Sequence, residues 1–145
     1  MSAQQTQEAM ERYIASAHSD VSMMAEDAVF TVMATGQENR GRDGIQQMLT
    51  YFYHQAFDAS AEVNLTIYTD EHAVLEGFFV GRHTGEFAGI PATNRPVRVP
   101  LCVVYDVAGG EITRGRIYFE MPALVAQLTG DDPQAQVEEP APAVT

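Results

Sequence analysis

The sequence predicts an α+β domain, a cone-shaped α+β barrel in which a strongly curved, mostly antiparallel sheet wraps around N-terminal helices. Two observations predict it. Helical spacing of apolar residues dominates the first 56 residues, whereas residues 61–121 consist of apolar strand patterns separated by short turns. Helices that come first and strands that come later segregate into two layers around one core. A strongly bent sheet covered by helices forms a cone with one open end.

The N-terminal part predicts two helices followed by a strand. Residues 4–17 place apolar side chains on one face at helical spacing and charged side chains on the other. Ser19 and Asp20 offer an N-cap for a short second helix that ends near Asp27. The apolar run at residues 28–33 then predicts the first strand.

The middle of the chain predicts a loop, a helix and the main sheet. Residues 35–41 are polar and bounded by glycine, which is typical of a loop, and residues 43–56 carry a third amphipathic helix. Pro122 permits a last short helix that ends at Gly130. The strands expected between these two helices are residues 61–69, 73–83, 95–107 and 112–121.

Length and composition predict one domain and a tail. The chain has 145 residues, which suits a single core, and we expect residues 1–130 to form it. Residues 131–145 are Pro, Glu, Gln and Ala without periodicity. Such a segment buries too little apolar surface to offset its ordering entropy, so it is expected to be disordered.

The charge balance excludes several classes of partner. The chain has 20 acidic and 8 basic residues, all of the latter arginine, and a formal net charge of -12. Binding to nucleic acid or to an anionic membrane needs clustered positive charge, so neither is expected. No apolar run approaches the roughly 18 residues of a membrane span, and no signal-peptide pattern opens the chain. We therefore expect a cytoplasmic protein.

Several short segments resemble the SnoaL-like polyketide cyclase family, whose members share the cone-shaped fold of nuclear transport factor 2 relatives. The similarity covers about residues 8–130 and is carried by HTGEFAGIP at residues 83–91, GEI at 110–112, RIYFE at 116–120 and AQL at 126–128. The resemblance implies a cone that binds a small, often hydrophobic molecule, and it implies a homodimer. Related cyclases pair a pocket histidine with an aspartate of the following strand as acid and base on an enolisable substrate.

His83 matches that pocket histidine, but the following strand contains no carboxylate, and the expected aspartate falls near Val97. The imidazole alone would then act as acid and base. An alternative is that His83 caps the end of its strand and hydrogen-bonds to the loop at residues 84–91. Because strand side chains alternate, a pocket-facing His83 predicts these substrate-binding residues: Phe30, Val32, Phe79, Val97, Val99, Leu101, Val103, Ile117 and Phe119.

The chain is also similar to the limonene epoxide hydrolase branch, at residues 25–28 and 41–43. That branch uses an Asp, Arg, Asp triad with a Tyr and an Asn that position water. The positions that match these five residues are apolar or glycine: Phe79, Gly77, Ile117, Phe30 and Val32. With no group left to activate water or to protonate an epoxide, epoxide hydrolysis is not expected.

These patterns predict an enzyme of the cyclase or isomerase type that needs no cofactor and transfers a proton on a polyketide-like or terpenoid-like molecule. The alternatives are a non-catalytic protein that binds a hydrophobic ligand, and a dimerisation module whose own side chains fill the cone. His18, His54 and His72 have no metal-site spacing, so no metal is expected. For Tyr13, Tyr51 and Tyr53 on the helices, core packing is expected, and the alternative is that the hydroxyl of one of them projects into the cone.

Overall fold

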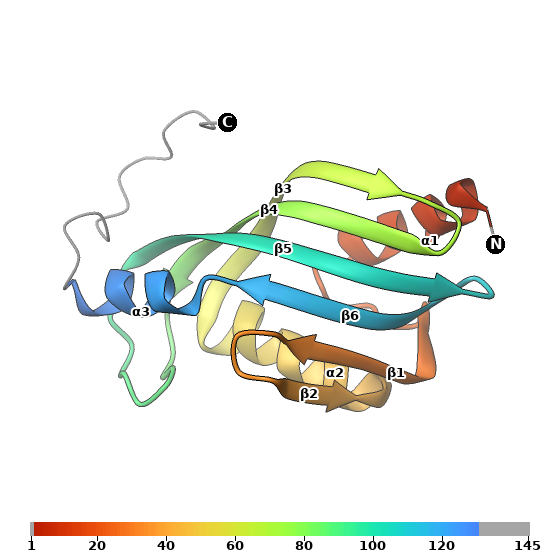
Figure 1. The fold of residues 1–145 in the computed structure, drawn as a ribbon. Helices are drawn as coiled ribbons and strands as arrows, with labels where there is room; N and C mark the ends of the chain where they lie inside the picture. Colours follow the sequence, from red (N-terminus) through yellow and green to blue (C-terminus); the bar gives the residue numbers. More distant parts are fainter. Residues whose placement is uncertain (1, 131–145) are drawn as a thin grey trace.

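The helices and strands follow the predicted order, with one additional strand and without the short second helix (Figure 1). The computed structural model describes residues 2–130, so the predicted tail at residues 131–145 lies outside the described residues. In chain order the elements are α1 (Ala3–Ala15), β1 (Met24–Val32), β2 (Gln37–Arg40), α2 (Gly41–Thr50), the π-helical turn η1 (Tyr51–Gln55), β3 (Phe57–Tyr68), β4 (His72–His83), β5 (Pro96–Ala108), β6 (Glu111–Phe119) and α3 (Met121–Thr129).

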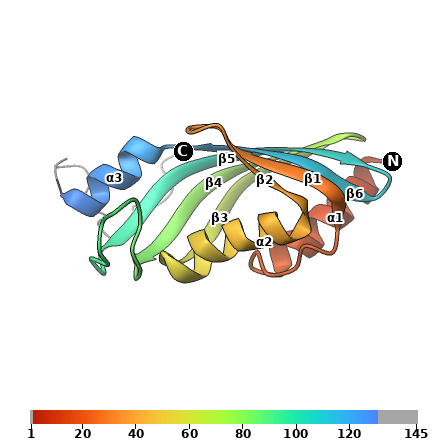
Figure 2. The same cartoon turned by 90° about the horizontal axis from the view of Figure 1, so that it is seen from below.

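The strands form one six-stranded sheet in the order β2-β1-β6-β5-β4-β3. Only β1 and β6 pair in parallel, and the other neighbours are antiparallel. Figure 2 shows the sheet bending over α1 and α2, with α3 at the end where β3, β4 and β5 curve away. The predicted α+β class and the mostly antiparallel, curved sheet are therefore confirmed. No helix among residues 2–130 is long and apolar enough to cross a membrane.

The predicted short helix near Asp27 is wrong, because residues Met24–Val32 form strand β1. A register shift between Met24 and Val29 interrupts the pairing of β1 with β6. Glu26 and Asp27 are exposed there, while Met24 and Ala28 both face the core. The bulge therefore gives a strand the four-residue spacing of buried side chains that is typical of a helix.

Strand β2 was predicted as loop because its side chains are polar. It pairs with β1 through backbone hydrogen bonds, from Val29 opposite Arg40 to Val32 opposite Gln37. Its one buried side chain, Asn39, donates from Nδ2 to the Phe30 carbonyl oxygen at 3.2 Å. Backbone pairing forms this edge strand without an apolar pattern in its sequence.

The third predicted helix is correct in position but changes its geometry part-way. After α2 the chain widens into the π-helical turn η1, closed by the Ala56 N–H donating to the Tyr51 carbonyl oxygen at 2.7 Å. Turns of this kind are rare and occur often at functional sites. Here the turn directs Phe52 and Tyr53 toward the sheet, where Tyr53 is buried.

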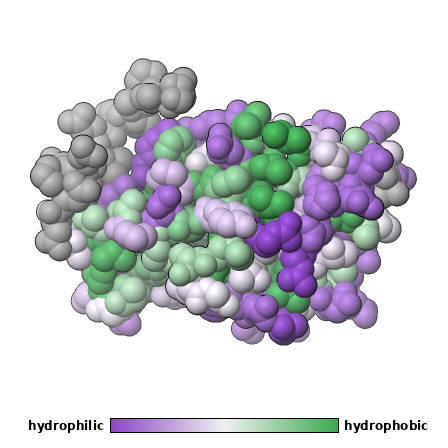
Figure 3. Space-filling view, viewed as in Figure 1, coloured by the Kyte–Doolittle hydropathy of each residue, from purple (hydrophilic) through white to green (hydrophobic). Residues whose placement is uncertain are grey.

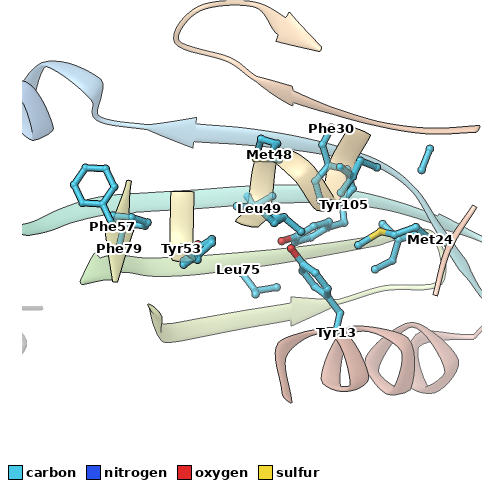
Figure 4. Close-up of a cluster of buried hydrophobic side chains, with 14 of the residues drawn as sticks. Tyr13, Met24, Phe30, Met48, Leu49, Tyr53, Phe57, Leu75, Phe79 and Tyr105 are labelled. Atoms are coloured by element: carbon cyan, nitrogen blue, oxygen red, sulfur yellow. The ribbon is translucent and has the colours of Figure 1, made fainter. Parts of the chain in front are cut away.

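The core fills the space between the concave face of the sheet and the helices (Figure 4). Inward-facing residues form rows across the strands, and one row joins Val63, Gly77, Leu101 and Phe119. A second row joins Ala73, Tyr105, Gly115 and Phe30. These rows form the wall against which the helices pack, so they decide which side chains can reach the interior.

Candidate functional site

A cavity of about 60 Å³ remains inside the cone, between the sheet and α1, α2 and η1. One water molecule needs roughly 10–15 Å³, so the cavity has room for about four to six waters. Its volume is below the roughly 300 Å³ at which ligand pockets of drug-sized molecules begin. Side chains therefore have to move before a ring-bearing molecule is enclosed.

Most of the predicted substrate-binding residues line this cavity. They come from the inner faces of β1, β4, β5 and β6, as the alternation of the strands predicts, and they are Phe30, Val32, Phe79, Leu101, Val103, Ile117 and Phe119. Met48, Leu49 and Phe52 complete the apolar wall from the helical side. The cavity is therefore apolar over most of its surface.

Val97, Val99 and His83 were expected in the pocket, and the structure places none of them on the cavity lining. All three are fully buried at the end of the cone near α3. Phe57 lies 5.2 Å from His83 and 5.3 Å from the cavity-lining Phe79, measured between ring centroids. Aromatic rings thus fill this end of the cone, and the pocket expected beside His83 is packed as core.

His83 makes its contacts with the loop that joins β4 to β5. The Thr93 backbone N–H donates to His83 Nδ1 at 3.1 Å, and the Thr93 hydroxyl lies 3.0 Å from the same atom. Because Nδ1 accepts a hydrogen bond, the ring proton is assigned to Nε2, which has no hydrogen-bond partner among the described residues. Burial lowers the pKa of His83, and the Gly85 backbone partly offsets this effect. In this arrangement His83 holds the loop through Thr93, and the Gly85 backbone, within residues 84–91, lies close enough to act on its pKa.

Apart from Glu62 and Glu76, the polar residues that line the cavity are Tyr13, His18, Tyr53 and Tyr105, which we call the polar end. Figure 4 shows the hydroxyl groups of Tyr13 and Tyr105 pointing toward each other. Burial is the main cause that raises the pKa of both phenols and of Tyr53. All three are therefore neutral hydrogen-bond donors at ordinary pH.

His18 follows α1 in a turn in which Ala17 and His18 both have positive φ, at 54° and 64°. Its ring stacks on Tyr53 with centroids 3.8 Å apart and an interplanar angle of 7°. Burial, and secondarily the neighbouring His54, lowers the pKa of His18 to about 4. The imidazole is thus neutral at pH 7, and no group among residues 2–130 forms a hydrogen bond with either ring nitrogen in this structure.

The sequence did not single out His18, because its neighbours are polar and no motif surrounds it. Of the three helix tyrosines whose hydroxyl could project into the cone, Tyr13 and Tyr53 line the cavity and Tyr51 does not. Among residues 2–130, no group of three or more His, Cys, Asp or Glu side chains is placed to hold a metal ion.

Comparison with known proteins agrees with this fold. The family model of SnoaL-like polyketide cyclases matches residues 4–128, which is most of the described chain. The chain belongs to the SnoaL-like polyketide cyclase family. No curated protein sequence matches it.

Solved structures with the same fold include two candidate polyketide cyclases. One, a SnoaL-like protein from a Jannaschia species, is 17% identical with a TM-score of 0.77, over 85% of this chain and 90% of that chain. The other, from Xanthomonas campestris, is 18% identical with a TM-score of 0.77, over 87% and 98% of the two chains. A ketosteroid isomerase-like protein from Catenulispora acidiphila, solved in complex with trimethylamine, is 19% identical with a TM-score of 0.69, over 86% and 94%. Because the sequence identities are below 20%, the similarity to these structures shows only that the chain shares their fold.

Proposed function

We propose that this SnoaL-like protein is a cofactor-independent enzyme of the cyclase or isomerase type that takes an apolar, polyketide-like or terpenoid-like molecule into the cone. The observation that carries the proposal is the cavity itself, whose wall is apolar and which ends in neutral phenol and imidazole groups. Such a lining fits a ligand with a hydrophobic body and few polar atoms. Proton transfer needs only groups of this kind and no metal.

The acid and base role expected of His83 would require its Nε2 atom to reach the ligand. Phe57 and Phe79 pack between this imidazole and the cavity. We therefore assign His83 to holding the β4–β5 loop. Proton transfer then has to come from a group that lines the cavity.

Access to the cavity is proposed to pass Phe52. The cavity and a surface groove beside α2 share three lining residues, Val32, Met48 and Phe52. Phe52 is half-buried on the π-helical turn, with its ring centroid 5.7 Å from that of Phe87 and 6.4 Å from that of Phe119. Rotation of this one ring would join the cavity to the groove and enlarge it.

Replacing Phe52 with alanine is expected to tighten the binding of a bulky neutral probe, N-phenyl-1-naphthylamine, by about 10-fold, because the truncation opens space that the probe must otherwise create. Fluorescence titration measures the affinity, and the thermal midpoint should rise when the probe binds. Tyr51→Ala is the matched control, since Tyr51 lies on the same turn but does not line the cavity. Equal affinities of wild type and both variants would contradict access past Phe52. Failure of the probe to bind or to stabilise any of them would favour the dimerisation module.

The homodimer is proposed to form through the outer face of the sheet. A register shift between Val63 and Leu65 turns Leu65 and Ile67 outward, where they are 46% and 48% exposed. Figure 3 shows apolar surface over β3, β4 and β5. Arg98 on this face pairs with Glu62 of the same chain at 2.9 Å, and Arg116 pairs with Asp106 at 2.8 Å. Because these two arginines are paired within the chain, the exposed apolar side chains best fit an equally apolar partner, and a second copy supplies one.

Ile67→Glu should convert the dimer into a monomer, because two uncompensated carboxylates would be buried at the interface. Light scattering coupled to gel filtration measures the mass. Gln47→Glu, which adds the same charge at an exposed position on α2, should leave the dimer intact. A wild-type protein that is already monomeric at micromolar concentration would rule out this interface.

A further inference from the structure

The surface groove beside α2 is much larger than the cavity that it adjoins. Its volume is about 640 Å³, within the roughly 300–1,000 Å³ that is typical of ligand pockets, whereas the cavity has about 60 Å³. The two spaces meet at Val32, Met48 and Phe52, which line both. A ligand that occupies both would place most of its volume in the groove and only a slender part inside the cone.

We propose that the ligand is an elongated amphiphile whose uncharged head group, rich in hydroxyl or amide groups, binds in the groove to Gln37 and Gln47. Its unbranched apolar chain passes Phe52 into the cavity. This inference rests on the proposed function, namely that the cone takes up an apolar molecule past Phe52. It goes beyond that function by assigning a second subsite and by naming the substrate class.

The groove is divided into an apolar floor and a polar rim. The side chains of the floor are buried or half-buried, and they are Val32, Met48, Phe52, Phe87 and Met121. The side chains of the rim are exposed and uncharged, and they are Thr35, Gln37, Gln47 and Tyr51. A molecule whose apolar part lies deep and whose polar part faces outward matches this division.

Strand β2 supplies one side of the rim. Gln37 pairs across the strands with Val32, and Asn39 pairs with Phe30, so both amides lie on the same face of the sheet as the cavity-lining residues of β1. Asn39 is buried, and its Oδ1 atom accepts a hydrogen bond from Gln37 Nε2 at 3.4 Å. This contact orients the Gln37 amide and leaves its Oε1 atom available as an acceptor.

Helix α2 supplies the opposite side of the rim. It packs beside β1 and β2 (Figure 1), and Gln47 and Met48 both line the groove from it. Gln47 is exposed, and within the described part of the chain its amide has no hydrogen-bond partner. A free amide offers two donors and one acceptor. Together with Gln37 Oε1 it complements a head group that donates and accepts hydrogen bonds.

The charges around the groove favour an uncharged head group. Glu38 and Arg40 are the charged residues that line the groove, and they pair with each other. Neither is therefore available as a counterion for a charged ligand. The formal net charge of -12 also repels an anion. Hydrogen bonds to the neutral amides remain as the means of recognition.

The head-group preference is tested with hexyl β-D-glucoside, hexanesulfonate and hexyltrimethylammonium, which share a six-carbon chain. Calorimetric titration should show that the glucoside binds wild type about 10-fold more tightly than either ion, which is the discrimination that two neutral hydrogen bonds supply. Methyl β-D-glucoside, which has the same head group without the chain, should bind more weakly than the hexyl compound because it buries no chain.

Gln47→Leu should weaken the binding of hexyl β-D-glucoside about 5-fold, because the side chain keeps its size but loses its hydrogen bonds. Gln4→Leu is the matched control, since Gln4 is an exposed amide on α1 that does not line the groove. Gln47→Glu should instead tighten the binding of hexyltrimethylammonium about 3-fold, because it adds an unpaired carboxylate to the rim. A residue with a merely structural role would not produce this exchange of preference.

The position of the chain is tested by intermolecular NOEs to bound hexyl β-D-glucoside. Its terminal methyl group should give NOEs to Leu49 and Val103, which line the cavity but not the groove. Its sugar protons should give NOEs to Gln47 and Met121, which line the groove but not the cavity. NOEs from the terminal methyl group to groove residues alone would contradict passage of the chain into the cone.

The outcomes separate this inference from the proposed function. Equal affinities for the three head groups, or the same affinity of Gln47→Leu and Gln4→Leu for the glucoside, would overturn the head-group subsite. If N-phenyl-1-naphthylamine still binds in that case, the proposed uptake of an apolar molecule stands. Failure of both this probe and hexyl β-D-glucoside to bind would defeat the proposed function itself.

Discussion

Gly77→Ala should unfold the protein or destabilise it by more than about 4 kcal/mol, a cost reached only where core backbone has to move. A Cβ atom at Gly77 would lie 1.8 Å from the Glu62 carbonyl oxygen and 3.0 Å from the Val63 Cα atom. These are backbone atoms of β3, which pairs with β4 along almost its whole length. Neither strand can retreat without breaking that pairing.

Urea denaturation followed by circular dichroism measures the effect, with Gly44→Ala as the matched control. Gly44 lies in α2, its nearest contact would be 3.8 Å away, and alanine favours a helix, so this variant should be neutral or up to about 1 kcal/mol more stable. If Gly77→Ala folds with a midpoint close to wild type, β3 and β4 would have to lie further apart than in this structure.

Alternation along the strands predicted the inner wall of the cone well. Phe79, Leu101 and Ile117 have the inward parity on long, regularly paired strands, and the cavity is lined by all three. The same parity places His83 on the inner face but says nothing about what covers it. Phe57 and Phe87 cover that end, and their contact at 5.3 Å joins residues 30 positions apart in the chain. Long-range packing of this kind decides which inward residues meet a cavity and which meet other side chains.

The errors in the secondary structure have local causes. The bulge in β1 mimics a helix end, and the polar β2 depends on pairing rather than on a pattern. The sequence analysis also missed His18 as a cavity residue. His18 reaches the cavity through a turn with positive φ and through the stack of its ring on Tyr53. Neither feature leaves a trace in residue spacing. The polar end of the cavity therefore emerges only when α1, η1 and β5 are placed together.

Acid should destabilise the protein well before its carboxylates are protonated. His18 and His83 have pKa values below the ordinary value of 6.5, for His18 about 4, and burial is the main cause for both. Below pH 6.5 the unfolded chain takes up protons that these buried rings cannot accept until lower pH. The free energy of unfolding therefore falls as pH decreases through this range, with up to about 3 kcal/mol from His18 alone.

Protonation of carboxylates lowers the free energy of unfolding further, but only at lower pH. Arg116 holds the pKa of Asp106 below its ordinary value of 3.8, and Arg98 holds that of Glu62 below 4.5. The interval between pH 6.5 and 4.5 consequently isolates the imidazoles. Urea midpoints measured across it should fall steadily for wild type, and less steeply for His18→Phe, which keeps a ring on Tyr53 without a titrating group. A flat wild-type profile, or an equal slope in the variant, would mean that His18 is solvated in the folded protein.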